Sequence, residues 1–288
     1  AVGSSSITMN YKSTLATVEQ MMSETVVLAS ERIEQELIAY KNVTMDTGCI
    51  PQLSDESVPL EDKRAIIDER VSMHGFQRGN IISIDGHSIF DGNDYSDREY
   101  VKQAMQGNVY VSEPLISKIT GELSIMVAAP LYADGSRSAG IVGVVYFVPP
   151  ETFLNDIVSS IKISPNSHAY MLNKNGDTIA DTTLETITTQ NIAREAQSDT
   201  SLEELAALHT EMWERKNGFG SFRNSGGAQF LAYAPVEGTD GWSVAVSALQ
   251  MDYLSDTYFG IILNLAVIAV AILASIVVAV KLSGNISV

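Results

Sequence analysis

Histidine is the side chain that most often performs acid–base catalysis or binds a transition metal, and this chain has four of them. They are His74, His87, His168 and His209, and no two of them have a metal-binding spacing such as His-Glu-x-x-His. The sequence also lacks the Gly-x-Ser-x-Gly elbow of a serine hydrolase. Cys49 is the only cysteine, which excludes an internal disulfide and a cysteine-rich metal site. We therefore predict a binding protein with no catalytic residue, metal or cofactor.

Two short stretches begin like known ligand loops and then depart from them. Residues 218–223 start like a dinucleotide-binding loop but lack its third glycine, so we expect a turn that leads into a strand. Residues 91–102 start like a calcium-binding loop. Ser96 and Lys102 stand where that loop requires glycine and glutamate, so a solvated turn is expected.

Arg98 lies between two acidic residues, Asp97 and Glu99, and just before a tyrosine. A guanidinium group can hold a carboxylate through two parallel hydrogen bonds, so Arg98 is a candidate for binding an anionic ligand. The alternative is a surface ion pair between Arg98 and Asp94 or Asp97. Composition alone does not separate these two roles.

Several tyrosines fall around the face of a predicted sheet near Arg98. Aromatic rings combined with one cation suit a small anionic or planar ligand. The alternative for each tyrosine is ordinary packing in the hydrophobic core. The predicted ligand site consists of Arg98, Tyr95, Tyr100, Tyr110, Ser112 and Tyr146.

The most regular segment is a nearly unbroken apolar run near the C-terminus, over residues 261–280. Such a run is long enough to cross roughly 30 Å of hydrocarbon as a helix, and Asn264 is its only strongly polar member. A buried hairpin is the alternative, but we predict a transmembrane helix over residues 258–281. Lys281 favours a cytoplasmic C-terminal end. The region before the run would then lie outside the cytoplasm, in a protein of the cell membrane.

The polar region carries a strong acidic bias. The chain has 35 aspartates and glutamates against 18 lysines and arginines, for a net charge of −17. Such a surface repels phosphate backbones, so we predict no nucleic-acid partner. Residues 1–6 have neither the basic start nor the apolar core of a signal peptide, and we expect an anchoring helix that precedes this sequence.

Apolar residues recur at helical spacing over residues 12–42 and predict one long helix. Its apolar positions extend beyond one stripe, so the helix is a natural homodimer surface. The alternative is that all of them pack within their own chain. A second, highly charged helix is expected over residues 60–74.

Sheet elements follow these helices. An Asp-Gly pair flanked by apolar runs predicts a hairpin over residues 79–90. The next expected elements are a helix over 96–105 capped by Ser96, an extended piece over 109–111, strands over 123–132 and 139–148, and a helix over 151–161.

The chain then repeats itself in outline. The pattern Asp-Gly-x-x-Ile-x-Asp of residues 85–91 recurs as Asn-Gly-x-x-Ile-x-Asp in residues 175–181. Ala-Pro-Leu at 129–131 is echoed by Ala-Pro-Val at 234–236. The common order of these echoes predicts two tandem modules with antiparallel, helix-covered sheets, an α+β fold.

At these residues the chain resembles a known family. The long first helix, the hairpin, residues 94–100, the segment Val-Ser-Glu-Pro at 111–114 and Gly-Glu-Leu at 121–123 together resemble the double Cache sensor domain of bacterial methyl-accepting chemotaxis receptors. The resemblance implies PAS-like modules. It divides the chain into an N-terminal stalk helix (1–43), a membrane-distal ligand-binding module (44–160), a membrane-proximal module (161–257), a transmembrane helix (258–281) and the start of a HAMP linker (282–288).

The resemblance also implies a function, which is binding of a small molecule in the distal module and signalling across the membrane. Arg98 matches the arginine of the family's amino-acid-binding motif, but Tyr100 and Val101 stand where that motif has tryptophan and tyrosine. A small carboxylate such as a hydroxy acid, or a planar heterocycle, is therefore expected as the ligand. The alternatives are the input domain of a sensor histidine kinase or diguanylate cyclase, or a tethered extracellular enzyme or adhesion module.

Overall fold

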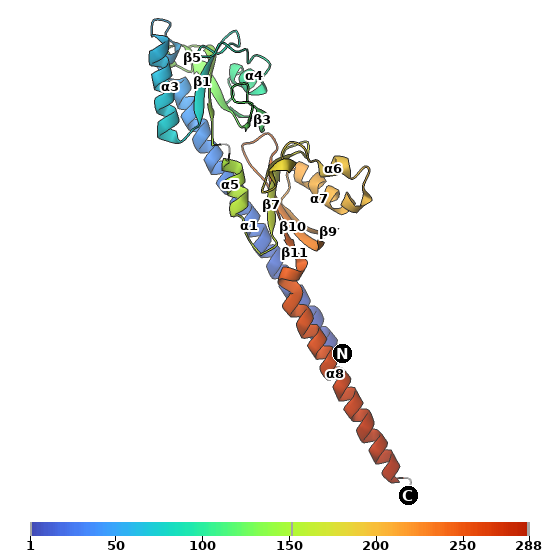
Figure 1. Cartoon of the computed structure of the whole chain (residues 1–288). Helices are drawn as coiled ribbons and strands as arrows, with labels where there is room; N and C mark the ends of the chain where they lie inside the picture. The colour runs from blue at the N-terminus through green and yellow to red at the C-terminus, as the bar shows by residue number, and fades with distance from the viewer. Residues whose placement is uncertain (1, 151, 287–288) are drawn as a thin grey trace.

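The computed structural model describes residues 2–150 and 152–286 of the chain. Two sheets are stacked along one long helix, α1, and a second long helix, α8, extends beyond them (Figure 1). The start of the expected helix at residue 151 and the last two residues of the expected HAMP linker, 287–288, lie outside the described residues.

The helical elements are α1 Val2–Gly48, α2 Pro51–Ser54, α3 Leu60–His74, α4 Glu99–Met105, η1 Ala133–Gly135, α5 Phe153–Ser160, η2 Leu184–Thr186, α6 Ile192–Glu195, η3 Thr200–Leu202, α7 Glu203–Trp213 and α8 Gln250–Ile286. The expected helices are present with shifted ends, and α2, α6, α7 and the short 3-10 helices η1, η2 and η3 were not predicted from the sequence. The strands are β1 Arg78–Ser83, β2 Tyr110–Val111, β3 Leu115–Ile116, β4 Leu123–Ser124, β5 Val127–Tyr132, β6 Ile141–Val148, β7 His168–Leu172, β8 Thr178–Asp181, β9 Gly218–Asn224, β10 Gly227–Pro235 and β11 Ser243–Leu249.

Helix α1 is longer than predicted at both ends. Its last turns contain Thr44 and Thr47, both fully buried, whose hydroxyls donate to the carbonyls of Tyr40 and Val43 one turn earlier. These bonds satisfy the polar side chains inside the helix, so threonine does not end it here. Gly48 then lies so close to the Pro130 carbonyl of β5 that a Cβ atom would not fit.

The two larger sheets share one topology. The distal sheet has the strand order β1-β6-β5-β2, and the proximal sheet has the order β8-β7-β11-β10-β9, all with antiparallel pairing. The repeated Ala-Pro segments occupy β5 and β10, which hold corresponding places in the two orders. The internal repeat read from the sequence is therefore a structural repeat.

The repeated turns also correspond. Gly86 follows β1 with φ 90°, and Gly176 follows β7 with φ 81°, a conformation that favours glycine. After Gly176 the chain forms β8, which pairs with β7. After Gly86 it makes only isolated bridges, such as Ile82 with Ser88, so the second strand of the predicted distal hairpin is not formed.

The predicted cap of helix α4 was wrong. The helix begins at Glu99 with Arg98 as its N-cap residue, and no side chain caps it. Ser96 instead lies in a tight turn, where its N–H donates to Asp94 Oδ1 at 2.8 Å. Aspartate competes well for such local bonds, and the turn delays the start of the helix by about one turn.

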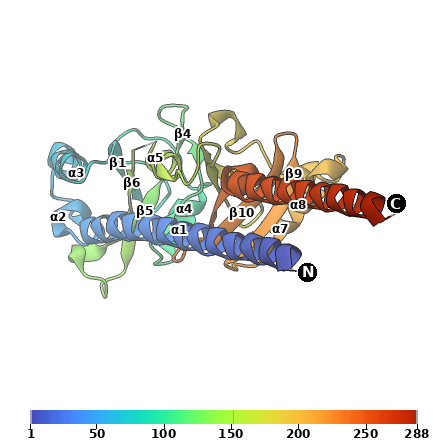
Figure 2. The same ribbon diagram turned by 90° about the horizontal axis from the view of Figure 1, so that it is seen from below.

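Each large sheet buries one face against α1 (Figure 2). The opposite face of the distal sheet is covered by α4, and the opposite face of the proximal sheet is covered by α7. Each module therefore has one wholly structural face and one face under a short helix and loops. The predicted helix-covered antiparallel sheets are confirmed.

Most apolar positions of α1 pack within the chain itself. Those buried are Val18, Met22, Val26, Ala29, Ile33 and Leu37. Leu28 and Ile38 point away from the sheets and are 65% and 39% exposed. The area left for a partner helix is thus smaller than the sequence pattern indicates, and homodimerisation stays a prediction.

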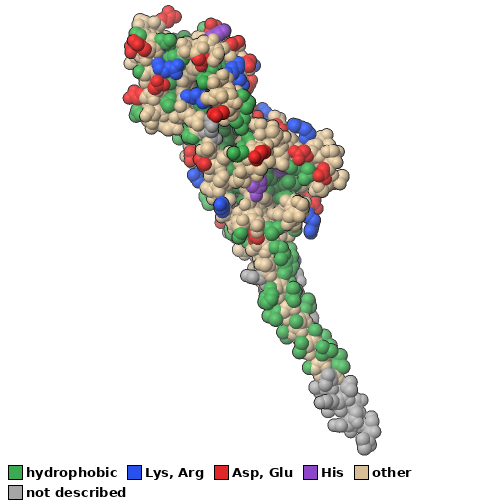
Figure 3. Space-filling model, in the orientation of Figure 1, with side chains coloured by type: hydrophobic (Ala, Val, Ile, Leu, Met, Phe, Trp, Pro, Cys, Tyr) green, Lys and Arg blue, Asp and Glu red, His purple; other side chains and the backbone are tan. Residues whose placement is uncertain are grey.

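Helix α8 continues directly from β11. Leu254 anchors its first turns in the core shared with α1. Beyond it, Tyr258–Ile276 has a mean hydropathy of 2.6 and none of it is buried in the chain. Figure 3 shows the apolar side chains covering this part of α8, whereas charged side chains gather on the two modules. By length and composition this segment qualifies as a membrane span.

The packing of α1 can be tested with two leucines on the same helix. Leu37 is 1% exposed and Leu28 is 65% exposed. We expect Leu37→Ala to lower the free energy of unfolding by about 2–5 kcal/mol, because it leaves a cavity in the core. The matched variant Leu28→Ala should change it by less than about 0.5 kcal/mol. Urea unfolding of both variants measures the difference, and equal losses would contradict the described burial.

Candidate functional site

A polar network, buried except for Asp91, lies on the face of the distal sheet that α4 covers. Asn80 on β1 is paired in register with Tyr146 on β6. The Asn80 amide donates to Asp91 Oδ2 at 2.9 Å and to the Tyr146 hydroxyl at 3.3 Å. Tyr95 donates to the same Asp91 oxygen at 3.2 Å, and Ser88 donates to Asn80 Oδ1 at 2.9 Å. These polar groups lie beside the apolar core that the same face shares with α4.

Three of the predicted tyrosines form one cluster in this network. Tyr95 and Tyr100 lie against Tyr146, with ring centroids 6.0 and 5.3 Å from it. All three are at most 2% exposed. Burial raises the pKa of Tyr100 and of Tyr146 far above the ordinary value, so both phenols remain neutral hydrogen-bonding groups.

Arg98 lies at the edge of the cluster. Its Nη2 donates to the backbone carbonyl of Ile116 at 3.2 Å, on the small hairpin formed by β3 and β4. The alternative ion pair of Arg98 with Asp94 or Asp97 is not formed among the described residues. Lys118 takes that place, because its Nζ lies 2.5 Å from Asp97 Oδ1 and lowers the pKa of that carboxyl group.

The other predicted residues, Tyr110 and Ser112, line a groove that adjoins the cluster at Tyr100. The groove has a volume of about 610 Å³ and lies between the two modules. Tyr110 and Ser112 come from the distal side, together with part of Tyr100, and Lys174 and Asp240 come from the proximal side. Burial raises the pKa of Tyr110, and the nearby carboxylates reinforce that shift.

The carboxylates of this groove all have partners within the chain. Gln103 donates to Glu99 at 2.7 Å, and Lys174 pairs with Asp240 at 2.6 Å. Glu113 accepts a hydrogen bond of 3.0 Å from Asn173 of the proximal module. The groove is therefore an opening at the surface, and its polar side chains also join the two modules.

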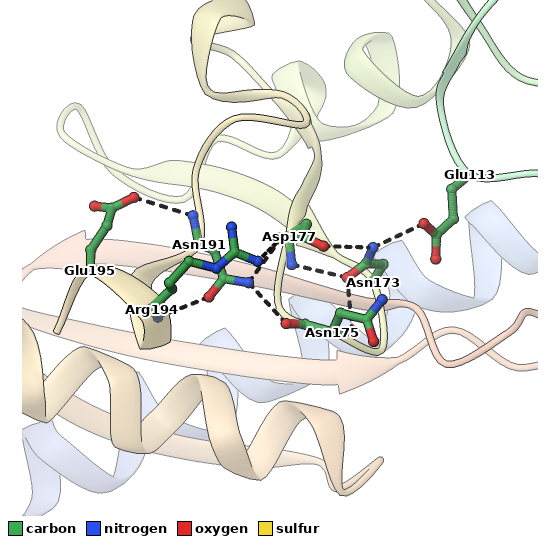
Figure 4. Close-up of polar contacts among 7 residues, drawn as sticks. All are labelled: Glu113, Asn173, Asn175, Asp177, Asn191, Arg194 and Glu195. Atoms are coloured by element: carbon green, nitrogen blue, oxygen red, sulfur yellow. Dashed lines mark hydrogen bonds and ion pairs between the residues drawn. The ribbon is translucent and has the colours of Figure 1, made fainter. Parts of the chain in front are cut away.

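Asn173 organises the proximal side of that interface (Figure 4). Its Oδ1 accepts the backbone N–H groups of Asn175 and Asp177, each at 2.9 Å, and so fixes the turn between β7 and β8. The Asn191 amide then bridges the Asn175 carbonyl and Asp177 Oδ1, again at 2.9 Å. This network holds the turn rigidly and presents the Asn173 amide to Glu113.

Sequence reasoning missed several polar residues of the distal face. Arg78 and Asn80 occupy alternate positions of β1, so they share the face that Ile82 also occupies. Arg78 Nη2 donates to Ser117 Oγ at 3.0 Å and to Ser124 Oγ at 3.2 Å. Two polar residues two positions apart at the start of an apolar strand were the signal that could have revealed them.

The histidines play structural parts where they are buried. In the proximal module His209 is 2% exposed, and its Nε2 lies 2.8 Å from the Tyr170 hydroxyl. Burial lowers the pKa of His209 to about 4. His168 pairs with Asp181 at 2.7 Å. No group of three metal-ligating side chains occurs in the part of the chain that the structure describes.

His209 gives the protein a defined acid sensitivity. An unfolded histidine takes up a proton near pH 6.5, whereas His209 in the folded protein does so only near pH 4. As the pH falls through this window the unfolded state is favoured, by up to about 3 kcal/mol from this group. We expect His209→Gln to remove this part of the pH dependence in urea unfolding at pH 7, 6, 5 and 4. Parallel curves for both proteins would contradict the burial of a neutral imidazole.

Comparison with known proteins places these features in a wider group. The Cache domain family model matches residues 4–257. A search of curated protein sequences gives no match. Among solved structures, the ligand-binding domain of the Pseudomonas fluorescens chemoreceptor CtaA in complex with L-isoleucine is 14% identical, with a TM-score of 0.66, over 85% of this chain and 98% of that one.

Two further solved structures are similar. The sensory domain of the Campylobacter jejuni chemoreceptor Tlp3 with isoleucine bound is 12% identical, with a TM-score of 0.61, over 83% of this chain and 95% of that one. The extracellular domain of the putative histidine kinase rpHK1S-Z16 is 16% identical, with a TM-score of 0.65, over 84% and 98% of the two chains. At these identities the likeness concerns the fold.

Proposed function

The chain belongs to the Cache domain family, and on that premise we propose that it forms the extracytoplasmic sensor of a membrane receptor and binds a small organic ligand in its distal module. The observation that carries this proposal is a polar network on the sheet face that faces away from α1, in which the exposed Asp91 accepts hydrogen bonds from the buried Asn80 and Tyr95, and Asn80 also contacts the buried Tyr146. Buried polar groups cost stability unless they are satisfied, and they suit recognition of a polar ligand.

A small carboxylate or a planar heterocycle fits the proposed site. The aromatic cluster supplies flat apolar surfaces, and Arg98 supplies a cation at its edge. The related Pseudomonas fluorescens domain was solved with L-isoleucine and with L-alanine, both of which carry a carboxylate. The proposed site residues remain Arg98, Tyr95, Tyr100, Tyr110, Ser112 and Tyr146.

The proposed receptor is a methyl-accepting chemotaxis receptor. Chemoreceptor domains are prominent among the structural relatives, and residues 282–288 would begin a HAMP linker after the span. The input domain of a sensor histidine kinase is the second candidate, because the rpHK1S-Z16 domain has the same fold. A diguanylate cyclase would use such a domain in the same way.

Signalling would pass through the proximal module to α8. We keep the division into a distal module over 44–160 and a proximal module over 161–257, with the span over 258–281. A ligand shifts the equilibrium between two arrangements only by its differential affinity for them. The Asn173–Glu113 bond and the continuous path from β11 into α8 are the contacts that such a shift would change. A homodimer through the exposed side of α1 would place two spans side by side.

A thermal-shift screen of the full chain in detergent micelles tests the proposed function. The panel contains small carboxylates, amino acids and nucleobases, and tryptophan fluorescence reports unfolding. A ligand at 100 times its Kd stabilises the folded state by about 2.7 kcal/mol, which raises the Tm by about 5–10 °C.

Two tyrosine variants locate the site. Tyr146→Phe should reduce the ligand-induced shift, because its hydroxyl belongs to the distal network. Tyr170→Phe, a buried tyrosine of the proximal module, is the matched control and should keep the shift. A shift lost only in Tyr170→Phe would move the site to the proximal module. No shift with any compound would contradict direct ligand binding.

A further inference from the structure

Arg78 differs from most arginines whose partners the structure describes, and shares with Arg98 the lack of a carboxylate or aromatic partner within residues 2–150 and 152–286. Arg32, Arg194 and Arg215 each lie within 4.0 Å of a carboxylate oxygen. Arg64 stacks over the ring of Phe90. Arg78 has neither kind of partner among the described residues, although acidic residues outnumber basic ones by 35 to 18 in this chain.

The hydrogen bonds of Arg78 leave its charge uncompensated. Only Nη2 has acceptors, and both are neutral hydroxyls, those of Ser117 and Ser124. Nε is buried and has no acceptor among the described residues. A guanidinium group carries five N–H donors, and a buried donor without an acceptor is costly. The chain thus keeps an electrostatically unfavourable group on the face that we propose for ligand binding.

The surroundings of Arg78 are rich in donors. Ser117 and Ser124 are 3% and 2% exposed. Their oxygens accept from Arg78, and Ser117 also accepts from the backbone N–H groups of Ile119 and Thr120. Their own hydroxyl hydrogens therefore remain able to donate. A guanidinium flanked by two hydroxyl donors is chemically complementary to a carboxylate.

We propose that Arg78, together with Ser117 and Ser124, binds the carboxylate group of the ligand. This inference rests on the proposed function and specifies its ligand class as a small carboxylate. It assigns the contact with the carboxylate to Arg78 and not to Arg98. The Arg98 side chain donates to the Ile116 carbonyl and so holds the hairpin in place.

The hairpin of β3 and β4 contributes both to the groove and to the surroundings of Arg78. Leu115 lines the groove and is paired in register with Ser124, whose hydroxyl accepts from Arg78. Both hydroxyls that accept from Arg78 belong to this hairpin and its turn. A carboxylate bound by Arg78, Ser117 and Ser124 would change these bonds, so ligand binding is coupled to the hairpin's position.

Isothermal titration calorimetry on the full chain in detergent micelles tests this inference. The ligands are acetate, lactate, pyruvate and succinate, with adenine and ethanolamine as non-anionic compounds. We expect at least one carboxylate to bind, and Arg78→Gln to weaken it on the order of 10- to 100-fold. Arg98→Gln, at the edge of the same site, should weaken it by less than about threefold, and Arg137→Gln on an exposed turn should leave it unchanged.

A ligand-free measurement separates a binding role from a structural one. Arg78→Met replaces an uncompensated charge by an apolar side chain of similar length, so its Tm should be unchanged or higher. A structural arginine would lose Tm on the same substitution. Ser124→Ala is a second, milder variant. It should weaken binding of the carboxylate without unfolding the protein.

The outcomes distinguish the two proposals. Loss of carboxylate binding in Arg78→Gln but not in Arg98→Gln supports the inference. The reverse pattern overturns it and leaves the proposed function standing. If adenine or ethanolamine binds and no carboxylate gives heat, the inference about Arg78 is refuted, but the proposed function is not. No binding of any compound contradicts both proposals.

Discussion

The packing of two sheets on one continuous helix is the constraint on which the rest of the structure depends. Helix α1, Val2–Gly48, gives each sheet an apolar surface for one face, and the strands of both modules contact it. Because that face supplies much of the core, the opposite face of each sheet is free to carry polar residues. The polar residues on this opposite face include Asn80, Tyr146 and Arg78 in the distal module. In the proximal module they include Tyr170 and His209.

The same helix also connects the distal module with the start of α8. Helix α8 begins where β11 ends, and Leu254 joins the core around α1 before the exposed apolar segment starts. The distal module is connected to this exit by α1, by α5, which packs on β7 and β8, and by the contact of Glu113 with Asn173. In the proposed receptor, a movement of the distal loops would reach α8 through these contacts.

Much of the fold could be predicted from the sequence because it depends on local patterns. Helical spacing revealed α1, and an Asp-Gly or Asn-Gly pair located the turn after the first strand of each module, where glycine adopts positive φ. The predicted Ser96 cap was wrong because Asp94 binds the Ser96 N–H in a turn, and several local bonds compete there. The surroundings of Arg78 could not be predicted, since Ser117 and Ser124 lie 39 and 46 residues further along the chain. Contacts of that range follow only from the three-dimensional fold.

In the proposed mechanism, a carboxylate binds the face of the distal sheet that carries Arg78 and moves the β3–β4 hairpin. Amide hydrogen exchange measures this most directly, on the full chain with and without the tightest-binding carboxylate of the calorimetric panel. We predict that exchange changes in the β3–β4 hairpin, residues 115–124, and in the first turns of α8, whereas the α1-facing strands stay unchanged. A change confined to the proximal module around α7 would contradict the account.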